Sequence, residues 1–444
     1  MVAQEIDLWH ADAGPFQPGG PGVGFAHERA YLQLEKNGRF NLQPQLGQVI
    51  PRLASGSRRL DPDYAAAFEP GTEATKPLYG IFKSIIVIPT HIAATEPDDC
   101  AIVGRREVAL DYRIVRAIHM GKAPAVVPAG QPSEQKPFIV GFAPLGQARD
   151  DIAIEDLIED SLRWYDAQPI DLGARAAQAV EALCKAGANV IIFPEATMHA
   201  SAHASLRAAI AEFGYRSQLR LVIAGSTPRD NRGGKPFNEA ILYDARGAEI
   251  GRQSKLHRWN LDEGQRRPLG LAPDMPADQK LFERITPGDS VTIFEMPGLG
   301  RLVVMICEDL SRSEPGAFLR SNLMLDWVFT PILDKSIESW RWMAQEFGKR
   351  AAQTGRCRVA VGNSLSLTHR LIEAGILPRE TPCGAAVCID WVPDQPDPDA
   401  VDPEYAPPVG KVRYFLWHVG LTEAAPSLQL PWTPDQWTEF TPDE

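Results

Sequence analysis

Short, unbroken apolar runs recur along the middle of this chain, and each predicts a strand covered on both faces. The first runs lie at 138–143, 189–193, 219–224 and 302–306. Between the first two, the alanine-rich segment 171–185 carries apolar residues at helical spacing, and Gly187 follows as a residue that ends helices. Strands that alternate with helices in this way predict an α/β fold.

The same alternation returns in the last third of the chain. Helical spacing marks 318–325 and 339–354, and apolar runs predict strands at 327–331, 358–361, 385–389 and 412–417. In between, segment 240–253 predicts a hairpin because two strand-like runs flank the turn at 244–247. Segment 154–165 is amphipathic, and then its pattern stops.

The first 135 residues follow no such order. A strand is predicted at 84–88, segment 105–118 fits either a strand or a helix, and 121–135 has the composition of a linker. We therefore predict an N-terminal accessory region at 1–135, one large domain at 136–420 and a C-terminal tail at 421–444. The accessory region would be an embellishment of the fold, or else a partner-binding or regulatory module.

Composition narrows the class of protein. A net charge of −12 over 444 residues argues against a nucleic acid as the main partner. The six cysteines are scattered, without CxxC pairs or metal-type spacing to histidine, so we expect a reduced, cytoplasmic protein without a metal or another cofactor. Neither a signal peptide nor a membrane span is evident, which leads us to expect no membrane partner.

Three reactive side chains stand where predicted strands end. Glu195 follows the 189–193 run through a proline, Lys255 follows the hairpin, and Cys307 ends the run 302–306. Taken singly, they have ordinary explanations as a loop carboxylate, a surface lysine and a buried structural cysteine. Together they supply a general base, a cation for a developing oxyanion and a nucleophile, which predicts an active site.

These segments resemble the signatures of a known family. The sequences FPE ending at Glu195, KLH beginning at Lys255 and ICEDL around Cys307 look like those of the nitrilase superfamily, the carbon–nitrogen hydrolases. They stand in the family's order at intervals of 60 (255 − 195) and 52 (307 − 255) residues, and the resemblance covers about 137–419. The sequences of these motifs are most similar to those of amidases and of the glutaminase domain of NAD synthetases. The resemblance implies a four-layer αββα sandwich, here with an N-terminal extension, that assembles as a homodimer or larger homo-oligomer.

The resemblance also suggests roles for individual residues. Cys307 would be the nucleophile and Glu195 the base, while Lys255 and the backbone N–H of Glu308 would stabilise the oxyanion. Aromatic walls are common in ligand pockets, so Trp259 and Trp340 are candidates for binding substrate.

Many family members have a second glutamate after the lysine, and this chain offers two candidates. Glu263 stands in a Glu-Gly pair at the offset of aliphatic amidases, and Glu283 resembles the position in carbamoylases and omega-amidases. Because the gap from Glu283 to the following Pro-Gly-Asp is shorter than in those enzymes, we predict Glu263 as the catalytic residue.

The expected function is hydrolysis of a small-molecule amide at a C–N bond other than a peptide bond, through a thioester on Cys307. Two alternatives remain. One is a nitrilase acting on a nitrile, although true nitrilases typically show Cys-Trp-Glu where this chain has Cys-Glu-Asp. The other is a non-catalytic scaffold whose residues 1–135 bind a partner.

Overall fold

The structure is a computed structural model. It describes residues 139–143, 145–146, 148–231, 234–296, 299–312, 325–335, 348–352 and 357–378, together with strands at 33–34, 39–42, 49–51, 85–87, 111–117, 383–393, 410–419 and 438–440.

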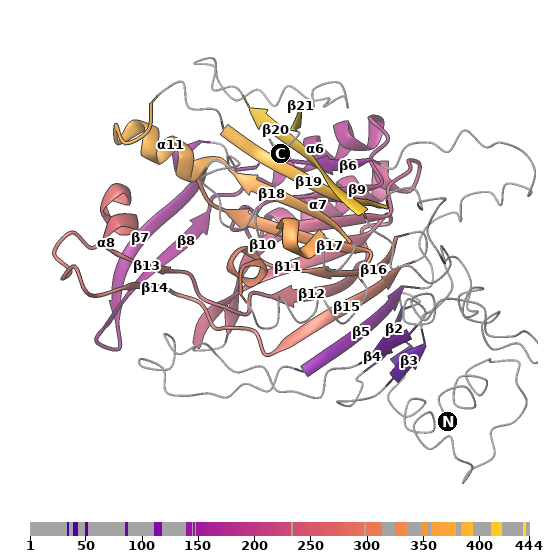
Figure 1. The fold of residues 1–444 in the computed structure, drawn as a ribbon, viewed down its shortest axis with the longest axis horizontal. Helices are drawn as coiled ribbons and strands as arrows, with labels where there is room; N and C mark the ends of the chain where they lie inside the picture. Colours follow the sequence, from indigo (N-terminus) through magenta and orange to yellow (C-terminus); the bar gives the residue numbers. More distant parts are fainter. Residues whose placement is uncertain are drawn as a thin grey trace, which may run out of the picture.

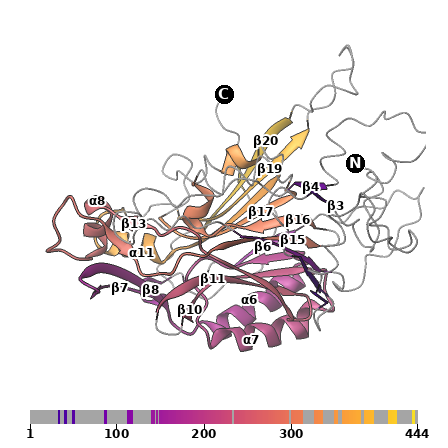
Figure 2. The ribbon, with the colours of Figure 1, turned by 90° about the horizontal axis from the view of Figure 1, so that it is seen from below.

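Two sheets stack face to face (Figures 1 and 2). The larger sheet has ten strands in the order β1 (Gln33–Leu34), β2 (Arg39–Leu42), β5 (Asp111–Ala117), β15 (Ser290–Met296), β16 (Gly300–Val304), β17 (Trp327–Leu333), β18 (Arg358–Ser364), β19 (Cys383–Pro393), β20 (Gly410–Val419) and β21 (Thr438–Phe440). The smaller has five, in the order β12 (Glu249–Ser254), β11 (Gly234–Asp244), β10 (Leu221–Asn231), β9 (Val190–Ile192) and β6 (Val140–Phe142).

The apolar runs fill the layers on both sides of the smaller sheet. In β9, Val190 and Ile192 face the larger sheet and join a core that contains Phe294 and Phe329. Ile191 points the other way, into the core beneath the helices. A strand packed on both faces has no solvent side, which is why its sequence is continuously apolar.

Helices cover the outer faces of the sandwich. Helices α6 (Gly173–Lys185) and α7 (Ala202–Ala209), the latter continued by η2 (Ile210–Gly214), pack on the smaller sheet (Figure 2). On the far side of the larger sheet, helical residues 348–352 bring Gly348 against Ile389 and bury Ala351. This arrangement confirms the predicted α/β sandwich. Among the described residues, no helix is long and apolar enough to cross a membrane.

A third, four-stranded sheet projects from one end of the sandwich (Figure 1). Its order is β13 (Asn260–Leu261), β14 (Leu281–Glu283), β8 (Leu162–Pro169) and β7 (Ile152–Glu159). Strands β7 and β8 form a hairpin that includes segment 154–165, for which the sequence predicted no definite structure. In its turn, Asp160 and Ser161 have φ angles of 54° and 63°. Positive φ at both turn residues suits the twist of a two-residue hairpin.

The N-terminal region contributes strands to the main sheet. Strand β5 runs parallel to β15 over Asp111–Arg116 and Ser290–Glu295, and β2 pairs with its other edge. Segment 105–118, open between strand and helix in the sequence, thus contains a strand, and β4 (Ile85–Val87) lies within the predicted strand 84–88 and pairs with β3 (Val49–Pro51). The domain boundaries at 135 and 420 stay a prediction.

Candidate active site

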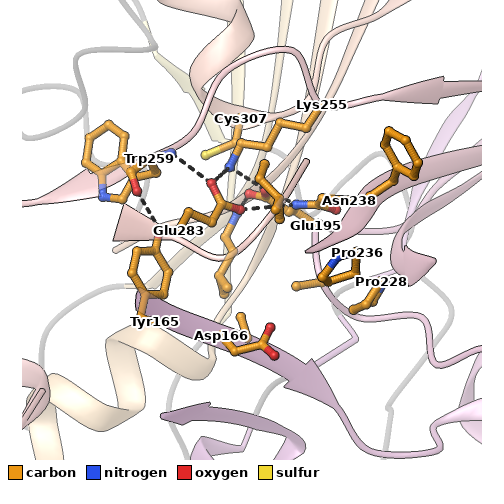
Figure 3. Close-up of a pocket in the computed structure, with 15 residues that line it drawn as sticks. Tyr165, Asp166, Glu195, Pro228, Pro236, Asn238, Lys255, Trp259, Glu283 and Cys307 are labelled. Carbon is orange, nitrogen blue, oxygen red and sulfur yellow. Dashed lines mark hydrogen bonds and ion pairs between the residues drawn. The ribbon is translucent and has the colours of Figure 1, made fainter. Parts of the chain in front are cut away.

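The strand ends at one end of the sandwich meet in a pocket (Figure 3). It encloses about 520 Å³ of empty space, part of it open to solvent. The structure brings Glu195, Lys255 and Cys307 together there, as the sequence predicted, and adds Glu283. The other lining residues are Tyr165, Asp166, Ala167, Ala196, Pro228, Pro236, Phe237, Asn238, Trp259, Ile285 and Leu333.

Glu195 is held on a tight turn after β9. The next residue, Ala196, has φ 51° and donates its N–H to Ser226 Oγ at 2.9 Å. The turn passes so close to Gly225 that a Cβ there would lie 2.1 Å from the Pro194 carbonyl oxygen, so only glycine fits. Buried Glu195 accepts hydrogen bonds on both carboxylate oxygens, and the backbone N–H of Leu333 donates to Oε2 at 3.0 Å.

Lys255 is almost completely buried and bonds to two carboxylates. Its Nζ donates to Glu195 Oε1 at 2.9 Å and to Glu283 Oε2 at 2.7 Å, and its side chain is 2% exposed. Burial alone lowers the pKa of Lys255, but the charges of Glu195 and Glu283 outweigh it and hold that pKa well above its usual value. The side chain is therefore an ammonium ion at neutral pH.

Glu283, rather than Glu263, is the second glutamate beside the lysine, which corrects the sequence prediction. Strand β14 runs parallel to β8 and sets Glu283 beside Tyr165, while the backbone N–H of Trp259 donates to its Oε2 at 2.8 Å. Glu263 instead begins helix α8 (Glu263–Arg266), where its carboxylate pairs with Arg267 outside the pocket lining. Burial raises the pKa of Glu283, and although Lys255 opposes this, the pKa stays above its ordinary value.

Cys307 stands in strained backbone shortly after β16, with Met305 and Ile306 between. Its φ is 50°, uncommon for a residue with a side chain, and it begins the short 3-10 helix η4 (Cys307–Leu310). The partly buried side chain lines the pocket. Burial, followed by the charge of Glu195, raises the pKa of the Cys307 thiol well above its usual value, and Lys255 opposes this only in part. The thiol is therefore protonated at rest and needs a base to react.

Asp309 ties the cysteine turn to the lysine loop. Its carboxylate accepts the backbone N–H groups of Leu256 and His257 at 3.1 and 2.9 Å, and that of Ile306 at 3.3 Å. It also bonds the His257 ring at Nδ1, 3.0 Å away. His257 therefore supports the lysine loop and is not among the residues that line the pocket.

Of the three residues predicted to bind substrate, the structure places one in the pocket lining. Trp259 lines the pocket, and its carbonyl accepts the Tyr165 hydroxyl at 3.1 Å. The Glu308 carboxylate pairs with Arg312 at 2.6 Å and is not part of the lining, so only its backbone N–H, at the start of η4, is a candidate contact. Trp340 lies outside the described residues.

Sequence reasoning missed Tyr165 and Asn238. Tyr165 comes from the unexpected hairpin, and burial raises its pKa well above the usual value, so the hydroxyl stays a donor. Asn238 could have been found, because the predicted hairpin sets Glu239 opposite Ser254 and hence Asn238 beside Lys255. The backbone N–H of Lys255 indeed donates to the backbone carbonyl of Asn238 at 2.8 Å.

An α/β sandwich that buries an ammonium between carboxylates beside a strand-end thiol has the parts that cleavage of a carbon–nitrogen bond needs. Residues 163–315 match the family model for carbon-nitrogen hydrolases, so this part of the chain is similar to that family.

Several solved structures are similar to parts of this chain, and one of them is described as a member of the nitrilase superfamily. The C. elegans NitFhit protein aligns at 14% identity over 51% of this chain and 50% of its own, with a TM-score of 0.35. An amidase from Nesterenkonia sp. aligns at 15% identity over 43% of this chain and 69% of its own, with a TM-score of 0.32. Saccharomyces cerevisiae Nit3 aligns at 14% identity over 48% and 76%, with a TM-score of 0.34. No curated protein matches in sequence.

Proposed function

We propose that this protein hydrolyses the C–N bond of a small amide through a thioester on Cys307. The observation that carries the proposal is the Lys255 ammonium, fixed by Glu195 and Glu283 in the pocket that Cys307 lines. A buried ammonium is costly, and a scaffold has no physical need to keep one beside a thiol.

Glu195 is the proposed base, and its bonding indicates which oxygen acts. Among the described residues, Oε1 accepts from both Lys255 and Asn238, whereas Oε2 accepts only from Leu333. A carboxylate oxygen has two lone pairs, so Oε2 keeps one to receive the thiol proton. Sγ then attacks the amide carbonyl carbon and forms the C–S bond.

The attack places negative charge on the carbonyl oxygen. The Lys255 ammonium is held in place before the reaction, so it stabilises that charge without reorganisation, and the Glu308 N–H, which has no intrahelical acceptor at the start of η4, adds a donor. Glu195 returns its proton to the amine, the C–N bond breaks and ammonia or an amine leaves. Glu195 next takes a proton from water, which attacks the thioester and releases the acid with regeneration of the thiol.

The charge of the pocket suggests a neutral or positively charged substrate. The described lining holds three carboxylates, Asp166, Glu195 and Glu283, against the single ammonium of Lys255. A substrate with a distal carboxylate would enter a site with an excess of negative charge, which disfavours it. Homo-oligomeric assembly and a cytoplasmic location stay predictions from the sequence.

The test is ammonia release from butyramide, 4-aminobutyramide and succinamate, which have similar lengths but differ in charge. We expect hydrolysis of the neutral or cationic amide, and Cys307→Ala should abolish it. Cys388→Ala is the matched control, since Cys388 is also partly buried and packs on the same core but is not part of the pocket lining. Ammonia release that survives in Cys307→Ala would refute the thioester mechanism. Preference for succinamate would refute only the charge argument.

A further inference from the structure

Asn238 lies between the two carboxylates of the site. Its side chain comes from β11, and its Nδ2 donates to Glu195 Oε1 at 2.8 Å and, more weakly, to Glu283 Oε1 at 3.4 Å (Figure 3). The residue is 7% exposed. One buried amide group thus contacts both acids that share the Lys255 ammonium.

The oxygen of the same amide is left without a partner. Asn238 Oδ1 is buried and accepts no hydrogen bond from any described residue. A buried carbonyl oxygen without a donor costs stability, and native proteins rarely retain one. The side chain is therefore best explained by its donor end, which among the described residues is accepted by the two carboxylates alone.

The cluster has a surplus of one negative charge, because Glu195 and Glu283 face one ammonium. On acidification, one carboxylate takes up a proton before the other. The short hydrogen bond from Asn238 and the N–H of Leu333 both stabilise Glu195 as an anion. Glu283 accepts the Trp259 N–H at 2.8 Å, just as Glu195 accepts that of Leu333, so the two acids differ in the contact with Asn238, which is longer to Glu283; burial also raises the pKa of Glu283.

The other ionisable groups near the pair do not compete for this proton. Lys255 remains charged, while burial raises the pKa of both Tyr165 and Cys307 well above their usual values and keeps them neutral. Burial also raises the pKa of Glu308, but its carboxylate pairs with Arg312, and in the described part of the chain neither Glu308 nor Asp334 makes a hydrogen bond to Glu195.

We propose that Asn238 is a positioning residue that keeps Glu195 the ionised member of the pair and leaves Glu283 to take up the first proton. This inference rests on the proposed function, in which Glu195 must be ionised to accept the thiol proton. Asn238 touches neither reacting atom in this scheme and acts through Glu195 alone. Without its donor, protonation at mildly acidic pH would fall on the base itself.

The experiment compares Asn238→Ala with the full-length wild type across pH 5 to 9. Two rates are measured: kcat/KM on the best amide of the panel, and alkylation of Cys307 by iodoacetamide, which needs no turnover. We expect the acid limb of both profiles to move upward by about one pH unit in the variant, a tenfold change in proton affinity. The rates should consequently fall up to about tenfold at pH values well below the midpoint of the limb and much less above it.

Asn189→Ala is the matched control. Asn189 is also 7% exposed and bonds through both ends of its amide, to the Ile139 N–H and the Gln218 carbonyl, but lies outside the pocket lining. Its loss should lower stability without moving either profile. Asn238→Ser retains a hydroxyl donor and should shift the limb by less than Asn238→Ala; if the alanine variant does not fold, this variant decides alone.

A uniform loss of rate at every pH, as in Asn189→Ala, would overturn the proposal, because a purely structural role gives parallel profiles. An unshifted limb in Asn238→Ser, where only that variant folds, would do the same. Failure of the wild type to hydrolyse any amide, with Cys307 no more reactive than Cys388, would instead refute the proposed function. The wild-type measurement thus separates the two failures.

Discussion

Replacement of Lys255 by methionine tests the buried ion cluster without reference to any substrate. Methionine keeps the length and most of the volume of lysine but removes the ammonium. Glu195 and Glu283, 3% and 8% exposed, would then face each other without their shared cation. The variant should fold less stably and lack hydrolase activity.

The size of the effect follows from burial and geometry. Removal of one partner from a buried ion pair costs about 3–5 kcal/mol, because the remaining charge is left uncompensated. Here one ammonium bonds two carboxylates, at 2.9 and 2.7 Å, so we expect a loss toward the upper end of that range. The expected loss of about 5 kcal/mol is a large part of the total free energy of unfolding of a typical domain, which is about 5–15 kcal/mol.

Equilibrium urea unfolding measures the loss, and pH gives its signature. Because the folded pKa of Lys255 lies above the unfolded value of about 10.4, the ammonium's contribution is complete below that pH and disappears as pH rises through the folded value. The difference between wild type and Lys255→Met should hence be constant from pH 7 to 9 and shrink above about pH 10.4. Adding Glu283→Gln to Lys255→Met should recover part of the stability, since one unpaired charge is removed.

Lys185→Met is the control for an ion pair of similar length. Lys185 lies 2.6 Å from Glu181 on α6, with side chains 70% and 39% exposed, so its removal should cost little. If both methionine variants lose the same small amount, the ammonium of Lys255 is not buried between carboxylates, and the reasoning behind the site fails.

Two further predictions concern single side chains. Glu283→Gln should lower kcat/KM by about 10- to 100-fold, the value of a hydrogen bond to a charged group, whereas Glu263→Gln should change it less than about twofold; equal effects would contradict the assignment of the second glutamate. Burial lowers the pKa of His203 to about 4, whereas its pKa in the unfolded chain is about 6.5. The neutral side chain therefore stabilises the fold fully above about pH 6.5, and this contribution is lost as the pH falls toward 4. In urea unfolding, the free energy of unfolding of the wild type should therefore fall by about 2 kcal/mol more than that of His203→Gln between pH 7 and 4, and parallel pH curves would refute this.

The sequence could predict the sandwich because its inner strands are covered on both faces. The run 189–193 contains β9, and 302–306 contains most of β16, because no solvent-facing position interrupts them. The hairpin β7–β8 could not be recognised, since its exposed and buried positions alternate irregularly and fit neither a strict strand nor a helical period. The intrinsic propensities of its residues do not distinguish strand from helix, and its pairing with β14 depends on the tertiary structure.

The residues of the candidate site likewise include some that the sequence could predict and one that it could not. Glu195, Lys255 and Cys307 could be found because each lies within three residues of the end of its own strand, a relation visible in sequence. The second glutamate could not be assigned, because proximity to Lys255 depends on how β14 pairs with β8, across more than a hundred residues (283 − 165 = 118). Local resemblance favoured Glu263, whose helix turns its carboxylate toward Arg267.

The side chains of the site come from separate sheets, and hydrogen bonds fix their mutual positions. Glu195 follows the smaller sheet, yet its N–H donates to the Ile332 carbonyl and its carboxylate accepts the Leu333 N–H, both on β17 of the larger sheet. The Lys255 loop also follows the smaller sheet and is bonded by Asp309, which follows β16 of the larger sheet. Apolar packing between sheets is not directional and does not by itself set a base and a nucleophile to within a fraction of an ångström. These polar bonds across the sandwich supply that precision, so the geometry of the site depends on the register between the two sheets as much as on the three reactive residues.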